Sequence, residues 1–271
     1  MFKTIDSDTS SGVCPFCSKD AFKFKEASKW MFLCHNCQRY MPWEKAGIND
    51  ELQVQKISNF NSIMSLCSRV DSLPENHKFR KYAESRKIPL DKVFYTQHFD
   101  KISEYSDTKV KDKERLILPF FKENGDLFGL QGRSLEKDQI RYITLMFDKK
   151  HPKIFGLNKI DNNKSIIIVE GPIDSLFLNN SLAMAGSDAN VDKYKSISVI
   201  VFDNEPRNRE IVSKMAKFLD NGFKIVIWPE QIKQKDINDL VLAGYEPNQI
   251  IKENVYSGLT GKIKLNQWKK V

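Results

Sequence analysis

The second half of the chain alternates two kinds of hydrophobic pattern. Short, nearly continuous apolar runs predict buried strands, which we place at residues 165–171, 182–188, 197–205 and 224–230. Stretches with apolar residues at helical spacing predict amphipathic helices, at 172–180, 207–222 and 236–244. Apolar strands that alternate with such helices are typical of an α/β fold, with a parallel sheet covered on both faces.

The first half shows less regular patterns. The apolar run 115–121 ends at a Glu-Asn-Gly-Asp turn, so residues 127–135 are its expected hairpin partner, and 139–145 is a further short strand. Upstream, residues 75–95 show helical spacing, which the sequence Ile88-Pro89 interrupts. Residues 103–114 are charged and predict an exposed loop.

Composition and charge narrow the class of protein. The 271 residues are 41% hydrophobic and 29% charged, which is a globular composition. No apolar run reaches the roughly 20 residues of a membrane span, and the first residues lack the apolar segment of a secretion signal, so we expect a cytoplasmic protein without membrane contact. The net charge of +8 is compatible with a nucleic-acid partner without demonstrating one.

Four of the five cysteines form two Cys-x-x-Cys pairs, Cys14 with Cys17 and Cys34 with Cys37. Each pair points two thiolates at one place, and two pairs complete the closed tetrahedral shell of a structural zinc ion. Residues 22–33 between the pairs read as a short hairpin, so this segment predicts a zinc ribbon. We expect His35 to lie outside the zinc shell.

The ribbon also carries aromatic and basic side chains that could stack bases and hold phosphates. An equally weighted alternative is that the aromatic residues fill the core of the ribbon. The residues concerned are Phe16, Lys23, Lys25, Lys29, Trp30 and Arg39.

Acidic residues follow three of the predicted strands. Glu170 comes after the first, Asp203 and Glu205 after the third, and Asp236 stands a few residues past the fourth. Ligands of open α/β sheets bind beyond the carboxyl ends of the strands, where these carboxylates would meet. Such a cluster of oxygens suits Mg²⁺. Asp236, and likewise Asp174, could alternatively serve only as a helix N-cap.

These segments resemble a known family. Glu170-Gly171-Pro172-Ile173-Asp174 is similar to the Glu-Gly-x-x-Asp element of the Toprim domain, and Asp203-Asn204-Glu205 to its Asp-x-Asp element, with Glu in place of the second Asp. Lys235-Asp236 resembles a later Lys-Asp element of phage primases. With the basic strands around Arg133 and Arg141 and the zinc ribbon upstream, the order of motifs resembles the DNA primases of tailed phages, nearest to the T-even type.

The resemblance implies an α/β fold class, with an N-terminal zinc ribbon followed by a primase catalytic domain built on a Toprim-type parallel sheet. We therefore expect five regions in order, namely a zinc ribbon, a helical linker region, a basic mixed-strand subdomain, a Toprim subdomain and a C-terminal tail without a recognised motif. Their boundaries are 1–45, 46–112, 113–163, 164–245 and 246–271.

The implied activity is the synthesis of RNA primers from NTPs on single-stranded DNA during phage replication, by Mg²⁺-dependent nucleotidyl transfer. Asp203, Glu205 and Asp236 would hold magnesium, and Glu170 would either hold it through water or act on the hydroxyl. Asp174 would support the site from behind, and Gly171 would allow a close backbone approach. The nucleotide-binding candidates are Arg133, Arg141 and, more weakly, Lys137.

Several alternatives stay open on the residues alone. A RecR-like recombination mediator also combines a zinc ribbon with a Toprim domain, and a Toprim nuclease would share the carboxylates. A zinc-binding adaptor would leave those carboxylates unexplained. The sequence lacks the Gly-x-x-x-x-Gly-Lys-Ser/Thr motif of P-loop motors, so we expect a primase that works with a separate hexameric helicase.

Overall fold

The computed structural model describes most of the chain, and these residues fall into two compact units, 1–62 and 63–271. None of the described helices is long and apolar enough to cross a membrane. Phe16 and residues 47–59 of the expected linker lie outside the described residues. The structure describes residues 3–6, 9–14, 17, 19–46, 60, 62–137, 139–186 and 189–271.

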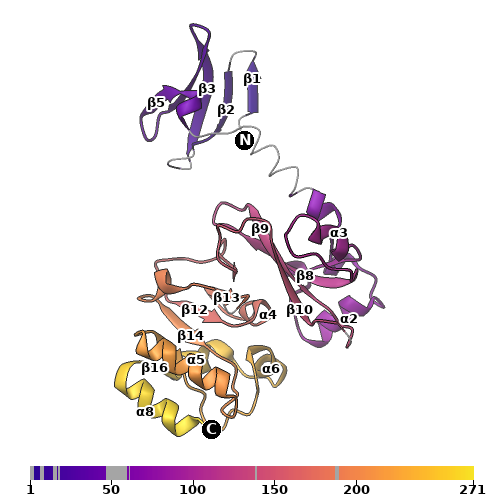
Figure 1. The fold of residues 1–271 in the computed structure, drawn as a ribbon, viewed down its shortest axis with the longest axis vertical. Coiled ribbons are helices and arrows are strands. Elements are labelled where there is room, and N and C mark those ends of the chain that lie inside the picture. Colours follow the sequence, from indigo (N-terminus) through magenta and orange to yellow (C-terminus); the bar gives the residue numbers. More distant parts are fainter. Residues whose placement is uncertain are drawn as a thin grey trace. The chain divides into compact units, whose positions relative to one another are not determined.

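The first unit is an antiparallel meander in which each strand pairs with the next (Figure 1). The expected hairpin is formed by β3 and β4, and Glu26 pairs with Lys29 across a two-residue turn. Both turn residues, Ala27 and Ser28, have positive φ (45° and 71°), the conformation that matches the twist of a two-residue hairpin. The elements are β1 (Lys3–Asp6), β2 (Thr9–Val13), β3 (Asp20–Glu26), β4 (Lys29–Cys34), β5 (Arg39–Pro42) and the 3-10 turn η1 (Trp43–Ala46).

The second unit contains two sheets, and the first of them is antiparallel in the order β10-β9-β8-β7-β6. The predicted hairpin of residues 115–121 and 127–135 is confirmed as β8 and β9, with Leu116 opposite Arg133. The strands are β6 (Ser68–Arg69), β7 (Phe94–Thr96), β8 (Arg115–Phe121), β9 (Leu127–Arg133) and β10 (Tyr142–Met146).

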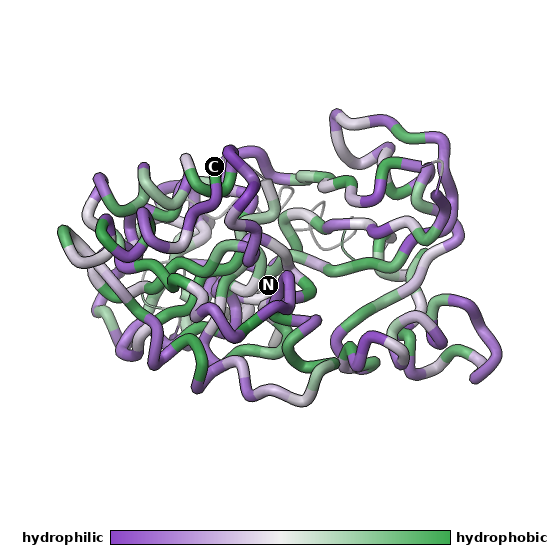
Figure 2. Tube along the Cα trace, turned by 90° about the horizontal axis from the view of Figure 1, so that it is seen from below, coloured by the Kyte–Doolittle hydropathy of each residue, from purple (hydrophilic) through white to green (hydrophobic). Residues whose placement is uncertain are grey.

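Strand β8 is apolar at nearly every position because this sheet is buried on both faces. Side chains alternate across a strand, and Leu116, Leu118 and Phe120 enter the large core shared with the second sheet. Ile117 points the other way, into a smaller cluster with Phe99 of the helix α3 (Phe99–Ser103). Figure 2 shows hydrophobic (green) and hydrophilic (purple) stretches following one another along the chain trace.

The second sheet has the order β11-β13-β12-β14-β15-β16. Its four central strands are parallel, as the sequence predicts, and antiparallel strands close both edges. The strands are β11 (Ile154–Phe155), β12 (Ile166–Val169), β13 (Ser181–Met184), β14 (Ser198–Val201), β15 (Lys224–Val226) and β16 (Val255–Tyr256).

Helices lie on both faces of this sheet. The connection from β12 through α4 (Pro172–Ser175) leads to β13, whereas the connection from β14 through α5 (Arg209–Asp220) leads the opposite way, to β15. Parallel crossovers are right-handed, so these two connections place their helices on opposite faces. Helix α6 (Ile237–Leu242) packs with α4, and α8 (Gly258–Trp268) lies beside α5 (Figure 1).

Two segments are more structured than the sequence indicates. The described part of the expected linker, 62–112, holds helices and also β6 and β7, which extend the first sheet of the second unit. The expected tail, 246–271, adds β16 to the edge of the second sheet and packs α8 against α5. The remaining elements are α2 (Lys78–Ser85), α7 (Pro247–Glu253), η2 (Val70–Ser72), η3 (Leu90–Lys92) and η4 (Asp192–Tyr194).

Candidate zinc centre and active site

The four paired cysteines converge in the first unit. Their sulfur atoms all lie within 4.8 Å of one another, with 3.7 Å between Cys14 and Cys37 and 3.5 Å between Cys17 and Cys34. A tetrahedral zinc with Zn–S bonds of about 2.3 Å requires sulfurs about 3.8 Å apart, so the arrangement fits the ion. A backbone hydrogen bond from Lys19 lowers the pKa of the Cys17 thiol to about 6, whereas burial raises the pKa of the Cys37 thiol to about 12, so the geometry of the four sulfurs carries the assignment to zinc.

The aromatic and basic residues of the ribbon divide between core and surface. Phe32 is fully buried, and Trp43 packs beside it. The Lys23 ammonium lies 4.2 Å from the Trp43 ring and 5.2 Å from the ring of Trp30. The ring of His35 contacts Phe22 edge-on at 5.9 Å, and His35 is not among the residues whose ligand atoms converge. The exposed members of the predicted set are Lys25, Lys29, Trp30 and Arg39.

In the second unit, the predicted acidic residues meet where the direction of the sheet connections reverses. Glu170 directly follows β12, and Asp203 follows β14, the neighbouring parallel strand. Because the connection from β12 leads toward one edge and that from β14 toward the other, the carboxyl ends of these two strands lie where the strand order reverses, the place at which open α/β sheets bind ligands. The backbone amide of Asp203 donates a hydrogen bond to Oε2 of Glu170 at 3.3 Å, which ties the two strand ends together.

The neighbouring Asp174 completes this cluster from α4. Its Oδ1 accepts a hydrogen bond from the amide of Asn238 at 3.0 Å. A β-carbon on Gly171 would stand 2.9 Å from Asp174 Oδ2. The glycine therefore permits the close approach that the sequence predicts.

The carboxylates affect one another's protonation. Burial, and then repulsion from Glu170 and Asp236, raises the pKa of Asp203 to about 7. Burial, followed by repulsion from Asp236 and Asp203, raises the pKa of Asp174 to about 8. Groups tuned in this way toward neutral pH are typical of functional sites.

Two lysines to which the sequence motifs assign no role neutralise part of this charge. Lys235 Nζ lies 2.9 Å from Glu205 Oε1 and 3.9 Å from Asp203 Oδ2. Its hydrogen bond lowers the pKa of Glu205. Lys214, on α5, lies 3.6 Å from Glu170 Oε1. The Lys-Asp motif could have drawn attention to Lys235, whereas Lys214 stands among other lysines of an amphipathic helix.

Asp236 serves as the N-cap of α6. Its Oδ1 accepts a hydrogen bond from the amide of Asp239 at 2.7 Å, which leaves Oδ2 for other contacts. Among the residues that the structure describes, the cysteines alone have ligand atoms that all lie within 4.8 Å, so the carboxylates form a looser set. Carboxylate oxygens are nevertheless the donors that Mg²⁺ takes, and the shared charge of the set fits a divalent cation.

The predicted basic residues occupy different environments. Arg133, at the end of β9, lies 4.8 Å from the ring of Tyr82 and 5.0 Å from the ring of Tyr142, and donates a hydrogen bond to the Tyr142 hydroxyl. Arg141 and Lys137 are exposed. Burial raises the pKa of Tyr142, Arg133 lowers it, and the carboxylate of Asp174 adds to the rise, which places this stack near the acidic cluster.

Helix α2 also contributes residues that sequence reasoning missed. Tyr82 fits the core periodicity of the helix, and its contact with Arg133 depends on tertiary structure alone. Arg86 pairs with Asp239 at 3.2 Å, and its carbonyl accepts a hydrogen bond from the side chain of Asn238. Helix α2 is thus attached to the helix that Asp236 caps.

No protein-family model matches the chain. The DNA primase of Enterobacteria phage T4 is 34% identical over 236 residues, which cover 82% of this chain and 69% of the phage protein. The DNA primase of Clostridium acetobutylicum is 30% identical over 161 residues, which cover 52% of this chain and 25% of that protein.

Solved primase structures share the fold. The zinc-binding and RNA polymerase domains of the Aquifex aeolicus primase match with a TM-score of 0.53 at 18% identity, covering 94% of this chain and 80% of that one. A DNA primase domain from Pseudomonas aeruginosa gives a TM-score of 0.56 at 16% identity, covering 74% and 78%. The DnaG primase catalytic domain bound to single-stranded DNA gives 0.55 at 14%, covering 81% and 80%.

Proposed function

The chain belongs to the DNA primase family, and on that premise we propose that it synthesises short RNA primers from NTPs on a single-stranded DNA template. The supporting observation is the meeting of Glu170, Asp203 and Glu205 at the reversal point of a parallel sheet, near the Arg133 stack. A cluster of carboxylates beside an arginine suits a reaction between a hydroxyl and a nucleoside triphosphate.

In the proposed reaction the 3′-hydroxyl of one nucleotide attacks the α-phosphate of the next, a new phosphodiester bond forms, and pyrophosphate leaves. Asp203, Glu205 and the free oxygen of Asp236 would hold Mg²⁺. When bound, Mg²⁺ would make the hydroxyl more acidic and balance the charge on the leaving pyrophosphate.

Glu170 is our candidate for the group that accepts the proton of the attacking hydroxyl. Burial raises its pKa above the ordinary range, while the nearby Lys214 opposes the rise. A carboxylate with a pKa moved toward the working pH is a better general base. Its hydrogen bond to the Asp203 amide fixes its position beside the proposed metal ligands.

Arg133 would hold the triphosphate. Contacts with the rings of Tyr82 and Tyr142 restrict its planar guanidinium, and an oriented guanidinium can contact two phosphate oxygens at once. Replacement by lysine keeps the charge and loses this geometry, so Arg133→Lys is expected to raise the KM for NTPs about ten-fold. Arg141 and Lys137 are exposed candidates for contacts with the nascent strand.

The zinc ribbon is proposed to hold the template, since its exposed Trp30 and basic residues suit single-stranded DNA. A separate hexameric helicase is the proposed replication partner, and the cytoplasm of the host is the proposed compartment. A pull-down without helicase, together with priming that helicase does not affect, would contradict the partnership.

The decisive experiment is primer synthesis with labelled NTPs, Mg²⁺ and single-stranded DNA. We expect short RNA products from the wild type and a loss of at least a hundred-fold for Asp203→Asn and Glu205→Gln. Glu253→Gln is the matched control, because Glu253 is an exposed residue of α7 that accepts a hydrogen bond from Gln249 on the same helix. It should prime like the wild type.

Other outcomes would select the alternatives. Binding to DNA without any product, on varied templates and with helicase supplied, would favour a recombination mediator. Degradation of the template without NTPs would favour a nuclease. Full activity of both carboxylate variants would refute the proposed site.

A further inference from the structure

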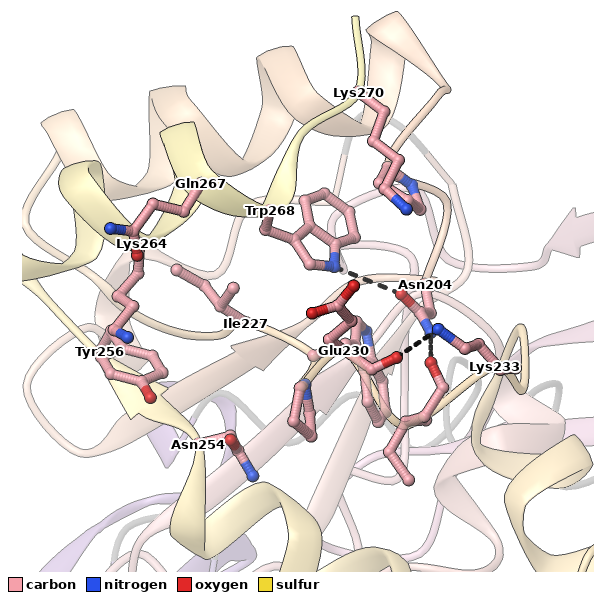
Figure 3. Close-up of a pocket in the computed structure, with 14 residues that line it drawn as sticks. Asn204, Ile227, Glu230, Lys233, Asn254, Tyr256, Lys264, Gln267, Trp268 and Lys270 are labelled. Carbon is pink, nitrogen blue, oxygen red and sulfur yellow. Dashed lines mark hydrogen bonds between the residues drawn. The ribbon is translucent and has the colours of Figure 1, made fainter.

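The C-terminal segment returns to the loop that carries Asp203 and Glu205. Helix α8 approaches α5 closely at Gly261. A β-carbon at this position would lie only 2.6 Å from a methyl group of Leu219 on α5, so the glycine is what allows the approach. At the end of α8, the indole nitrogen of Trp268 donates a hydrogen bond to Oδ1 of Asn204 at 3.3 Å (Figure 3).

A second hydrogen bond follows immediately. The backbone amide of Lys270 donates to the carbonyl of Pro206 at 2.8 Å. The two acceptors, Asn204 and Pro206, are the residues on either side of Glu205. Two residues of the same C-terminal segment, Trp268 and Lys270, therefore hold the acidic loop on both sides of a proposed metal ligand.

Asn204 also joins this loop to a third segment. Its side-chain amide donates to the carbonyls of Ile232 and Gln234, both at 3.0 Å, and its backbone amide donates to the carbonyl of Lys235 at 2.7 Å. Residues 232–236 carry Lys235 and Asp236. A single asparagine thus connects the loop of Asp203 and Glu205, the segment that leads to Asp236, and the end of α8.

The indole of Trp268 packs against the edge of the large core and makes this hydrogen bond as its directional contact. It is half-buried and borders a cavity of about 520 Å³ with an apolar floor at Ile227 and Trp228 (Figure 3). A ring beside open space can move when its one directional contact is lost. Removing the N–H group should therefore loosen the loop without leaving a hole in a tightly packed core.

We propose that Trp268 and Asn204 are positioning residues of the active site, which hold the Asp203–Glu205 loop in register with Asp236. Neither residue is assigned contact with substrate or metal. The proposal rests on the proposed function insofar as it takes these carboxylates as metal ligands. It gives the last residues of the chain a part in catalysis that their sequence does not indicate.

The test uses Trp268→Phe in the full chain, because phenylalanine keeps an aromatic ring and loses the N–H donor. Mn²⁺ affinity, measured without NTPs or template from the electron paramagnetic resonance signal of unbound Mn²⁺, should weaken about five-fold, the equivalent of one hydrogen bond of about 1 kcal/mol. Amide hydrogen exchange at residues 203–208 should accelerate. Gln267→Ala, at an exposed neighbour of Trp268 on the same cavity, is the control and should change neither.

A double-mutant cycle distinguishes positioning from general destabilisation. Asn204→Ala should weaken Mn²⁺ binding more than Trp268→Phe, because it removes all three side-chain hydrogen bonds. In the Asn204→Ala background, Trp268→Phe should have no further effect, since its acceptor is gone. Additive losses would show that the two residues act independently and would overturn the proposal.

Asp203→Asn, measured in parallel, distinguishes a failure of the proposed metal site from a failure of the proposed positioning role. If Asp203→Asn binds Mn²⁺ as the wild type does, the proposed metal site fails. If Asp203→Asn loses binding while Trp268→Phe keeps wild-type affinity and exchange rates, the metal site stands and the positioning role is refuted.

Discussion

The carboxylate of Asp174 makes the stability of this primase depend on pH. Its pKa rises from the ordinary 3.8 to about 8, because burial and then the repulsion from Asp236 disfavour the charged form. Asparagine at this position keeps an oxygen that can accept the hydrogen bond of the Asn238 amide and carries no charge. We therefore expect Asp174→Asn to stabilise the fold at neutral and alkaline pH.

The direction in which the free energy of unfolding changes with pH follows from proton binding. Between about pH 4 and pH 8 the folded chain keeps a proton on Asp174 that the unfolded chain has released. The stability associated with this proton is fully present below about pH 4 and is lost as the pH rises through 8. At about 1.4 kcal/mol per pKa unit, the rise sets an upper limit of about 6 kcal/mol.

The expected effect is smaller than this limit. Asp174 keeps partial contact with solvent, and screening reduces the repulsion from neighbouring carboxylates, so we expect a gain of about 2 kcal/mol at about pH 9. The gain should shrink toward zero at about pH 4, where both forms are neutral.

Urea unfolding without added divalent cations, followed by far-ultraviolet circular dichroism, measures this difference. Asp220→Asn provides the control, because Asp220 is an exposed residue of α5 that pairs with Lys262 at 2.6 Å. Its effect should be small and should not grow between about pH 5 and pH 9. If the free energy of unfolding changed by the same amount with pH for the wild type and for Asp174→Asn over this pH range, the reasoning would be refuted.

Three further changes test other parts of the molecule. Cys34→Ser should unfold the ribbon, which would appear as faster hydrogen exchange in β3 and β4 with unchanged exchange in the second unit. The variant should also initiate primers less often than the wild type, and equal initiation would contradict the proposed template role. Gly132→Ala would place a carbon 2.5 Å from the Phe99 ring and should cost about 1–3 kcal/mol in urea unfolding, whereas an unchanged midpoint would mean that the ring moves freely. Lys235→Met should shift the acidic limb of the pH profile of priming to higher pH, because Lys235 lowers the pKa of Glu205 and opposes the rise in the pKa of Asp203. Lys233→Met is the control, because the Lys233 ammonium contacts a backbone carbonyl, and it should leave the pH profile unchanged.

Much of the second unit could be predicted from hydrophobic pattern. The runs at 115–121 and 197–205 became β8 and β14 because strands buried on both faces must be apolar throughout. The cysteine pairs were equally informative, since their spacing alone fixes the ligand set. The carboxyl ends of β12 and β14 then placed the acidic residues in one crevice.

The last residues were not predictable in the same way. Helix α8 has Leu259 and Ile263 exposed and Leu265 buried, so its apolar residues do not mark a single face. Strand β16 has two residues, too few for an alternating pattern. Both elements form because the edge of β15 and the surface of α5 are already in place, and such tertiary support leaves no periodic signal in the sequence.

The groups that compensate the charge of the carboxylates could not be predicted from the sequence either. Motifs could locate Glu170, Asp203 and Glu205 because strand ends fix where carboxylates stand, but they could not show what compensates them. Lys235 and Lys214 reach the cluster from the loop after β15 and from α5. Lys214 looks like an ordinary surface lysine in sequence, and the Lys-Asp motif names Lys235 without indicating which carboxylates it pairs with. Cations of the chain itself balance part of the charge of this site, so any change to these lysines acts on the carboxylates that we propose as catalytic. Such lysines are therefore the residues to examine beside the acidic motifs when the pH dependence of priming is interpreted.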